Sequence, residues 1–292
     1  MKVETVGIMS PGDMGSAVGK ILRDEGINVI TCLEGLSELS QLRAKKANMH
    51  NVRTMEQLVC DSDIILSILV PSEALTFSQR ISEVFRRTGA TSVFADCNAI
   101  APHTVAKIKS MMTDLGITFI DGGIIGPPPR VDKKSTRIYC SGPDTSAMES
   151  LNQYGLDVRV VGNKIGQASS LKMVYSASNK GTIALWTELL VAAKVLGVEE
   201  ALKNEFELSQ DVIYEEIIER IPSMPRRAKR WTGEMIEIAD TFEGIGMTPR
   251  VFLGAHDMYR FISNTPLADQ TSLEPDSSLE KALRIFSEQL SL

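Results

Sequence analysis

The stretch that decides the fold lies close to the start of the chain and reads Val6-Gly7-Ile8-Met9-Ser10-Pro11-Gly12-Asp13-Met14-Gly15. Its first half is apolar, as expected for a buried strand, and its second half is a turn that contains two glycines. The residues that follow predict a helix of ordinary length. The order of strand, tight turn and helix predicts the opening unit of an α/β fold.

Short apolar runs alternate with longer amphipathic stretches through the first half of the chain. The predicted strands are residues 3–9, 28–31, 63–69, 92–95 and 118–120, with two more at 137–140 and 157–161. Pro143-Asp144 marks the start of a helix between the last two. This alternation requires right-handed βαβ crossovers and predicts a mostly parallel, doubly wound sheet.

The pattern changes after Gly166. Residues 167–196, 201–219 and 228–242 carry helical periodicity without a convincing strand. Residues 221–230 contain two prolines and predict a loop, and the segment beyond Leu267 is polar at first and then weakly helical. We therefore predict an α/β domain over 1–165 and an all-α domain over 166–292.

Composition excludes several classes of protein. The chain has 292 residues, with 31 Lys and Arg against 37 Asp and Glu, and this acidic balance argues against a nucleic-acid partner. No apolar run approaches the roughly 20 residues that span a bilayer, so we expect a cytoplasmic protein with no membrane partner. Four scattered cysteines indicate reduced thiols, and three histidines without ligand spacing predict no metal.

The turn after the first strand stands where a Rossmann-type fold places G-x-G-x-x-G. Gly12 supplies close backbone approach to a pyrophosphate, Gly15 allows close packing of the helix, and Ser10 replaces the first glycine. We predict that residues Ser10, Pro11, Gly12, Asp13 and Met14 bind the coenzyme NAD or NADP at the helix N-terminus. The alternative is a tight turn with no ligand.

The end of the second predicted strand should lie near the adenosine ribose of the coenzyme. Glu34 lies 19 residues after Gly15, and a carboxylate there accepts a hydrogen bond from the 2′-hydroxyl and repels a 2′-phosphate. This slightly favours NAD over NADP. The alternatives are a solvated Glu34, or a 2′-phosphate held by Arg43 or Lys45 from the next helix.

Four further segments keep a common order and spacing. They read DIILSILVP at 63–71, DCNAIAP at 96–102, DGGIIG at 121–126 and GQASSLK at 166–172. Together with the opening turn, they resemble the β-hydroxyacid dehydrogenases, which include 3-hydroxyisobutyrate and 6-phosphogluconate dehydrogenases. The resemblance implies an NAD(P)-dependent oxidoreductase with a small-molecule substrate, and a homodimer formed through the helical half.

The resemblance also assigns site residues. It places Leu69 and Val70 beside the coenzyme and Asn98 beside the nicotinamide, although Asn98 is equally compatible with a simple turn. Ile124, Ile125 and Gly126 stand where the family has its substrate-binding loop. Lys172 stands at the position of the family's catalytic lysine.

The sequence departs from the family where the substrate carboxylate is bound. A serine and two glycines are replaced by Ile125, Gly126 and Pro127, and the family's asparagine four residues after the lysine is Ser176. Isoleucine has no hydroxyl and proline has no N–H, so hydrogen-bond donors are lost. These changes resemble a subgroup with a shorter C-terminal domain and poorly defined substrates, and they favour a bulkier or less charged substrate.

On a helix that starts near Gly166, Lys172, Ser176 and Asn179 share one face. A lysine here either extends to solvent or acts as a general acid and base. The second role requires a pKa lowered by burial or by a nearby cation, for which Lys180 is a candidate. We predict that Lys172 exchanges the proton while Asn179 and Ser176 orient the reacting oxygen.

Other readings remain open. The basic run 226–230 either recognises an anionic substrate or lies in a solvated loop, and His256 and Asp257 are further candidates for the cleft. An imine reductase is one rival function, although the retained Lys172 counts against it. A dinucleotide-binding regulatory protein without turnover is the other.

Overall fold

The computed structural model describes residues 2–130, 135–270 and 276–290. Its contacts divide the chain into two units, Met1–Met173 and Val174–Leu292. The division falls within helix α7 (Gln167–Ser176), slightly past the limit that the sequence predicts between residues 165 and 166.

The first unit is built on an eight-stranded sheet with the order β3-β2-β1-β4-β5-β6-β7-β8. Its strands are β1 (Thr5–Ile8), β2 (Asn28–Cys32), β3 (His50–Val52), β4 (Ile64–Ser67), β5 (Val93–Asp96), β6 (Phe119–Ile125), β7 (Arg137–Ser141) and β8 (Val158–Gly162). All neighbouring pairs are parallel except β6 with β7. The predicted doubly wound, mostly parallel sheet is confirmed.

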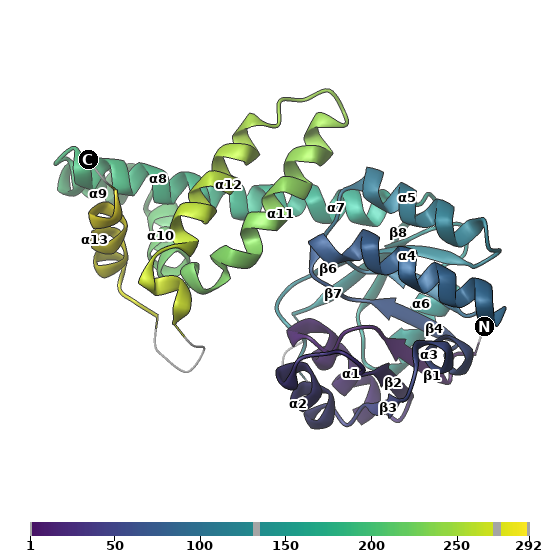
Figure 1. The fold of residues 1–292 in the computed structure, drawn as a ribbon. Coiled ribbons are helices and arrows are strands. Elements are labelled where there is room, and N and C mark those ends of the chain that lie inside the picture. The colour runs from purple at the N-terminus through teal and green to yellow at the C-terminus, as the bar shows by residue number, and fades with distance from the viewer. Residues whose placement is uncertain (1, 131–134, 271–275, 291–292) are drawn as a thin grey trace. The chain divides into compact units, whose positions relative to one another are not determined.

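Helices cover both faces of this sheet (Figure 1). They are α1 (Asp13–Asp24), α2 (Glu38–Lys46), α3 (Met55–Asp61), α4 (Pro71–Thr88), α5 (Pro102–Thr113), α6 (Ser146–Ser150), the 3₁₀ helix η1 (Leu151–Tyr154) and the first part of α7. Apolar side chains of α1 and α6 pack into one core, and those of α3, α4 and α5 pack into the other. Burial on both faces explains why the strands read as continuous apolar runs.

Two local features of the first unit differ from the prediction. Strand β3 was missed because two of its three residues are exposed and polar, so the segment has no apolar run. The strand predicted at 118–120 is longer in the structure, because β6 continues to Ile125 and every one of its residues is buried. Pairing with β7, where Ile124 faces Ile138, extends the strand through two glycines that by themselves predict a turn.

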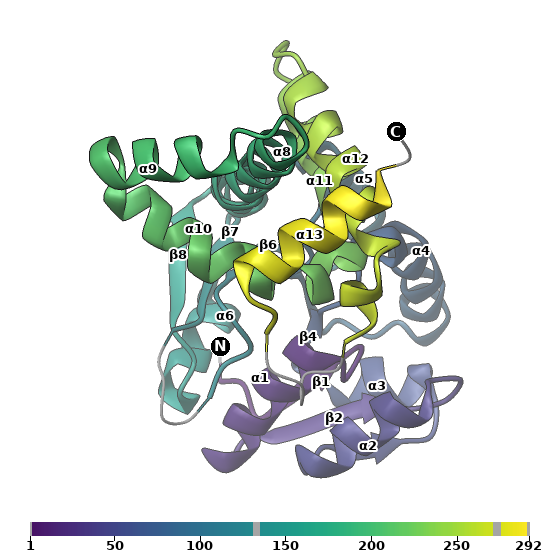
Figure 2. The same cartoon turned by 90° about the vertical axis from the view of Figure 1, so that its left-hand side faces the viewer.

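The second unit is all-α within its described residues, which confirms the predicted class. Its elements are the π-helix η2 (Ala177–Gly181), α8 (Thr182–Val195), α9 (Glu199–Ser209), α10 (Asp211–Ser223), α11 (Pro225–Glu243), α12 (Arg250–Ser263), the 3₁₀ helix η3 (Pro266–Asp269) and α13 (Leu279–Gln289). Helices α11 and α12 form a hairpin, and α13 lies against α8 and α10 (Figure 2). No helix in the described part of the chain is long and apolar enough to cross a membrane.

The loop predicted at 221–230 is wrong. Helix α10 continues through Pro222 to Ser223, and α11 begins at Pro225. Proline is tolerated in the first turn of a helix because the N–H that it lacks has no partner there. This accounts for Pro225 at the start of α11, whereas Pro222 is the second-to-last residue of α10, and both prolines stand at the junction of the two helices.

Candidate functional site

Four of the predicted segments meet at one edge of the first unit. The turn after β1, Leu69 and Val70 after β4, Asn98 after β5 and the end of β6 all lie at carboxyl ends, because these strands are parallel neighbours. Strands β2 and β3 lie on one side of β1, and β4 and the later strands lie on its other side. The strand order therefore reverses between β1 and β4. Ligands of open α/β sheets bind at such a switch point.

The glycine turn has the shape that a pyrophosphate needs. Gly12 is the N-cap of α1, no side chain caps the helix there, and a Cβ added to Gly12 would meet nothing within 4 Å. A Cβ on Gly15 would instead collide with the carbonyl oxygen of Ser10. Space is therefore available at Gly12 but not at Gly15, and the N–H groups at the start of an uncapped helix fit a dinucleotide phosphate.

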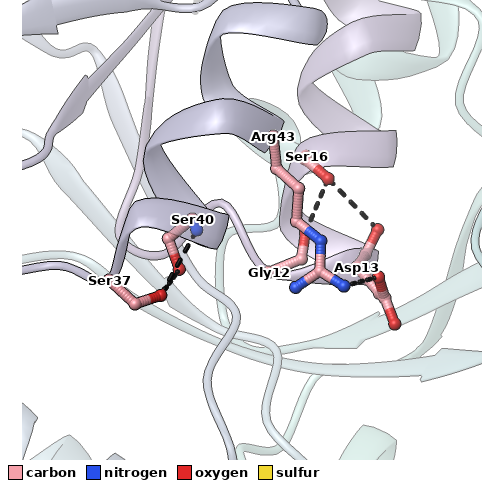
Figure 3. A network of polar contacts seen from close by, with 6 residues as sticks. All are labelled: Gly12, Asp13, Ser16, Ser37, Ser40 and Arg43. Carbon is pink, nitrogen blue, oxygen red and sulfur yellow. Dashed lines mark hydrogen bonds and ion pairs between the residues drawn. The ribbon is translucent and has the colours of Figure 1, made fainter. Parts of the chain in front are cut away.

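Arg43 reaches this turn from α2. Its guanidinium forms an ion pair with the carboxylate of Asp13 at the start of α1, as Figure 3 shows. Beside it, the hydroxyl groups of Ser37 and Ser40 lie 3.1 Å apart at the N-terminus of α2. The positive charge of Arg43 is thus balanced by Asp13. The side chain of Glu34 is exposed, in the loop after β2.

Asn98 joins the ends of two strands through its side chain. Its Oδ1 accepts a hydrogen bond from the N–H of Leu69 at 2.5 Å, and its Nδ2 donates to Ser67 Oγ at 2.9 Å and to Asp96 Oδ2 at 2.8 Å. Its own N–H donates to Asp96 Oδ1 at 3.0 Å. Asn98 thus fixes the loop after β4, in which the side chain of Val70 is 51% exposed.

Asp96 is buried at the end of β5. Burial, together with a smaller effect of the nearby charge of Asp121, raises the pKa of its carboxyl group to about 7, although the two hydrogen bonds from Asn98 lower it. Burial also raises the pKa of Asp121, while hydrogen bonds from Ser169, Ser141 and Gly166 oppose the rise. Sequence reasoning missed both carboxylates as parts of the site, although each directly follows an apolar run.

Lys172 lies on α7, within the first unit. Its Nζ donates a hydrogen bond to the carbonyl oxygen of Ile124 at 2.7 Å, so the side chain is directed to the end of β6. The side chains of Ile124 and Ile125 are buried, and these residues offer their backbone at that edge. Gly126 has φ +124°, and a Cβ there would collide with the backbone of Ser135, so glycine is required.

Ser176 and Asn179 belong to the second unit, at and just after the end of α7. Ser176 is buried, and Asn179 lies in the π-helix η2. The side-chain oxygen of Asn179 accepts a hydrogen bond from Arg220 Nη1 at 3.3 Å. A π-turn holds more residues than an α-turn, so the α-helical spacing that we assumed between Ser176 and Asn179 does not hold.

Lys180 does not act as the unbalanced cation that the sequence suggests. Its Nζ lies 2.5 Å from Glu234 Oε2, and both side chains are about nine-tenths buried. The hydroxyl of Tyr259 donates to the carbonyl oxygen of Lys180 at 2.6 Å, which satisfies a backbone group of the π-turn. This cluster anchors η2 to α11 and α12 within the second unit.

The basic run 226–230 lies on α11. Arg226 pairs with Asp276, Lys229 with Asp269 and Arg230 with Glu234, while the Arg227 guanidinium lies 5.6 Å from the centre of the Trp231 ring. His256 Nδ1 lies 2.9 Å from the carbonyl oxygen of Thr232, and Asp257 pairs with Arg260. Among the described residues, no three His, Cys, Asp or Glu side chains are arranged to hold a metal ion.

Comparison with known families identifies the first unit. Residues 5–161, more than half of the chain, match the model of the NAD binding domain of 6-phosphogluconate dehydrogenase. The chain belongs to this family. Residues 193–262 match a domain of unknown function, DUF1932. The predicted relationship to the 6-phosphogluconate and 3-hydroxyisobutyrate dehydrogenases is thereby confirmed, and the first unit is an NAD(P)-binding domain.

Solved structures share this fold. The conserved protein MTH1747, of unknown function and with structural similarity to 3-hydroxyacid dehydrogenases, is 29% identical with a TM-score of 0.67, over 88% of this chain and 97% of that one. The 3-hydroxyisobutyrate dehydrogenase of Mycobacterium tuberculosis is 14% identical with a TM-score of 0.72, over 97% and 99%. An imine reductase variant of Myxococcus stipitatus is 18% identical with a TM-score of 0.58, over 90% and 93%.

Proposed function

We propose that the protein is an NAD(P)-dependent oxidoreductase that transfers hydride between the coenzyme and a hydroxy acid or a related alcohol and carbonyl pair. One observation carries the proposal: Lys172 Nζ is held 2.7 Å from the Ile124 carbonyl oxygen, at the edge of the sheet where the open glycine turn also lies. A proton-exchanging group and a coenzyme cradle at one strand edge are the parts that such a reaction needs.

The bound coenzyme would supply the hydride acceptor or donor. The chain's own residues would do the rest: the N–H groups after Gly12 hold the pyrophosphate, and Asn98 holds the Leu69 loop in place. Lys172 takes the hydroxyl proton when an alcohol is oxidised and returns a proton when a carbonyl is reduced.

NAD(H) is the proposed coenzyme in preference to NADP(H). The carboxylate of Glu34 follows β2, where it would accept a hydrogen bond from a ribose 2′-hydroxyl and repel a 2′-phosphate. Arg43, one of the two candidates for a phosphate-binding cation, already pairs with Asp13. Calorimetric titration with NADH and NADPH tests this preference, and tighter binding of NADPH would contradict it.

The substrate is proposed to be bulkier or less charged than a short hydroxy acid. Ile125 has no side-chain donor and Pro127 has no backbone N–H, so neither residue can donate these hydrogen bonds to a substrate carboxylate. The same lack of donors favours an imine as a second candidate substrate, while Lys172 favours the alcohol and carbonyl pair. A panel of hydroxy acids including L-serine, aldehydes and cyclic imines, followed by NADH absorbance, separates the two.

Lys172→Met is the decisive variant in that panel. We expect turnover to fall by about a hundredfold or more, because a positioned general acid or base typically contributes that much. Coenzyme affinity should stay at the wild-type value, since Lys172 is not part of the phosphate turn. Turnover at the wild-type rate would refute the role of Lys172, and coenzyme binding without turnover on any substrate would favour a regulatory protein.

We also propose that the protein is a cytoplasmic homodimer. Helix α8 is apolar around most of its circumference, and Leu185 and Leu189 on it are 54% and 45% exposed. A second copy would remove this apolar surface from water. Light scattering after gel filtration should give twice the 32.0 kDa chain mass, and a monomer would contradict the dimer.

The proposed cytoplasmic location rests on the thiols. The four cysteines are all free, as is typical of a reducing compartment.

A further inference from the structure

The start of α7 is held by a side chain from a distant strand. Asp121 on β6 is fully buried, and its Oδ2 accepts hydrogen bonds from the N–H groups of Gly166 and Ala168 at 2.9 Å and of Ser169 at 3.1 Å. The hydroxyl of Ser141 on β7 donates to the same oxygen at 2.9 Å. This carboxylate therefore accepts three backbone N–H groups at the start of α7, and the Ala168 N–H also lies 3.0 Å from Ser141 Oγ.

The same strand holds α7 again, further along the helix. Lys172 donates to the carbonyl oxygen of Ile124, three residues after Asp121 on β6. Between these two points, a Cβ on Gly123 would lie 3.0 Å from the Ala168 carbonyl oxygen and from Lys172 Cβ. Asp121 and Gly123 face the same side of the strand, because alternate residues of a strand do so. Helix α7 thus rests on bare strand backbone beside its capping carboxylate.

A buried carboxylate from another strand is an energetically costly way to cap a helix. A Ser, Thr or Asp at the N-cap would satisfy the helix from within, but Gly166 precedes α7 instead, with φ +99°. The capping group is a buried carboxylate, its Oδ1 has no hydrogen-bond partner in the described structure, and a second buried carboxylate, Asp96, lies opposite it on β5. Burying a carboxylate costs free energy that a serine or threonine cap would not, so helix capping alone does not explain why a carboxylate stands here.

We propose that Asp121 is the positioning residue for Lys172: by tying the N-terminus of α7 to β6, it fixes where along the strand the lysine side chain arrives. Gly123 is the second part of the device, because it lets the helix approach closely enough for Lys172 to reach Ile124. This inference rests on the proposed role of Lys172. It explains why Lys172 Nζ lies at the carbonyl oxygen of Ile124, by means of a residue outside the proposed reacting groups.

Competitive labelling tests the inference without a substrate or coenzyme. The protein is pulsed with acetic anhydride at fixed pH, and acetylation of Lys172 is measured by mass spectrometry relative to the exposed Lys107 on α5. In Asp121→Asn the N-terminus of α7 loses a charged acceptor, so the contact between Lys172 and Ile124 should loosen. The asparagine amide oxygen can still accept these N–H groups but carries no charge, so the hydrogen bonds weaken. We expect the labelling rate of Lys172 to rise roughly tenfold, the equivalent of about 1.4 kcal/mol.

Asp63→Asn is the matched control. Asp63 Oδ2 also accepts two backbone N–H groups, those of Glu4 and Thr5 at 2.8 Å, but it lies away from α7. The control should lower the melting temperature without changing the labelling of Lys172. Equal labelling of Lys172 in wild type and folded Asp121→Asn would overturn the proposal and leave Asp121 a purely structural cap.

Gly123→Ala decides the matter if Asp121→Asn does not fold. It keeps every hydrogen bond of the cap but pushes α7 away from β6 at Lys172, so labelling of Lys172 should again rise, and an unchanged rate would overturn the proposal. Failure of the proposed function gives a different result. A chain that binds no coenzyme refutes the oxidoreductase, whereas the labelling result stands on its own.

Discussion

Replacing Asp96 by Asn should flatten the pH dependence of stability. In the folded protein, burial raises the pKa of Asp96 from 3.8 to about 7, so the folded state binds a proton that the unfolded state has already released. The stabilisation from this proton is fully present below pH 3.8 and is lost as the pH rises to about 7. A difference of about 3 pKa units corresponds to up to about 4 kcal/mol across this window.

The assay is urea unfolding at pH 5, 6, 7 and 8, compared between the wild type and Asp96→Asn. We expect the wild-type free energy of unfolding to fall between pH 5 and 7 and the variant's to change less, because an amide does not titrate. Asn98→Ala removes the hydrogen bond from the side-chain Nδ2 to Asp96 Oδ2 and keeps the one from the backbone N–H, so the pKa of Asp96 should rise and the loss of stability should extend to higher pH. Parallel pH profiles for the wild type and Asp96→Asn would refute the reasoning.

Three further predictions concern the glycine turn, the Arg43 pair and the buried ion pair. Gly12→Ala should fold normally, since its Cβ meets nothing, but weaken NADH binding about tenfold by calorimetry, whereas Gly15→Ala should lose roughly 1–3 kcal/mol of stability because its Cβ meets the Ser10 carbonyl. Asp13→Asn releases Arg43, so the ratio of NADPH to NADH affinity should rise, and an unchanged ratio would show that Arg43 does not reach the ribose. Glu234→Gln leaves Lys180 buried without its counter-charge and should cost about 3–5 kcal/mol in urea unfolding; a loss under 1 kcal/mol would mean that Lys180 reaches water.

Local pattern was enough to predict much of the fold. The apolar runs around Ile8, Leu66 and Phe94 are buried on both faces of a parallel sheet, and such runs are visible in sequence because no polar residue interrupts them. The β3 strand and the extension of β6 through Gly122 and Gly123 were not predictable in this way. Both depend on pairing with a neighbouring strand, which residue preferences do not contain.

In the candidate site too, local sequence pattern predicts some residues, and others depend on contacts between distant parts of the chain. The glycine turn and Lys172 were predicted because their spacing is local and because they resemble a family pattern. The carboxylates Asp96 and Asp121 were missed as site residues, since their importance comes from hydrogen bonds to Asn98 and to the start of α7, which lies 45 residues away from Asp121. The π-turn at Asn179 was also missed, because it depends on contacts with Tyr259 and Glu234 from later helices.

The central claim is that a nicotinamide dinucleotide binds at the turn around Gly12, and calorimetric titration of the purified protein tests it most directly. We predict saturable binding of NADH with one site per chain, tighter than that of NADPH and weakened in Gly12→Ala. The absence of measurable heat with NAD⁺, NADH, NADP⁺ and NADPH, each repeated at two temperatures, would contradict the claim.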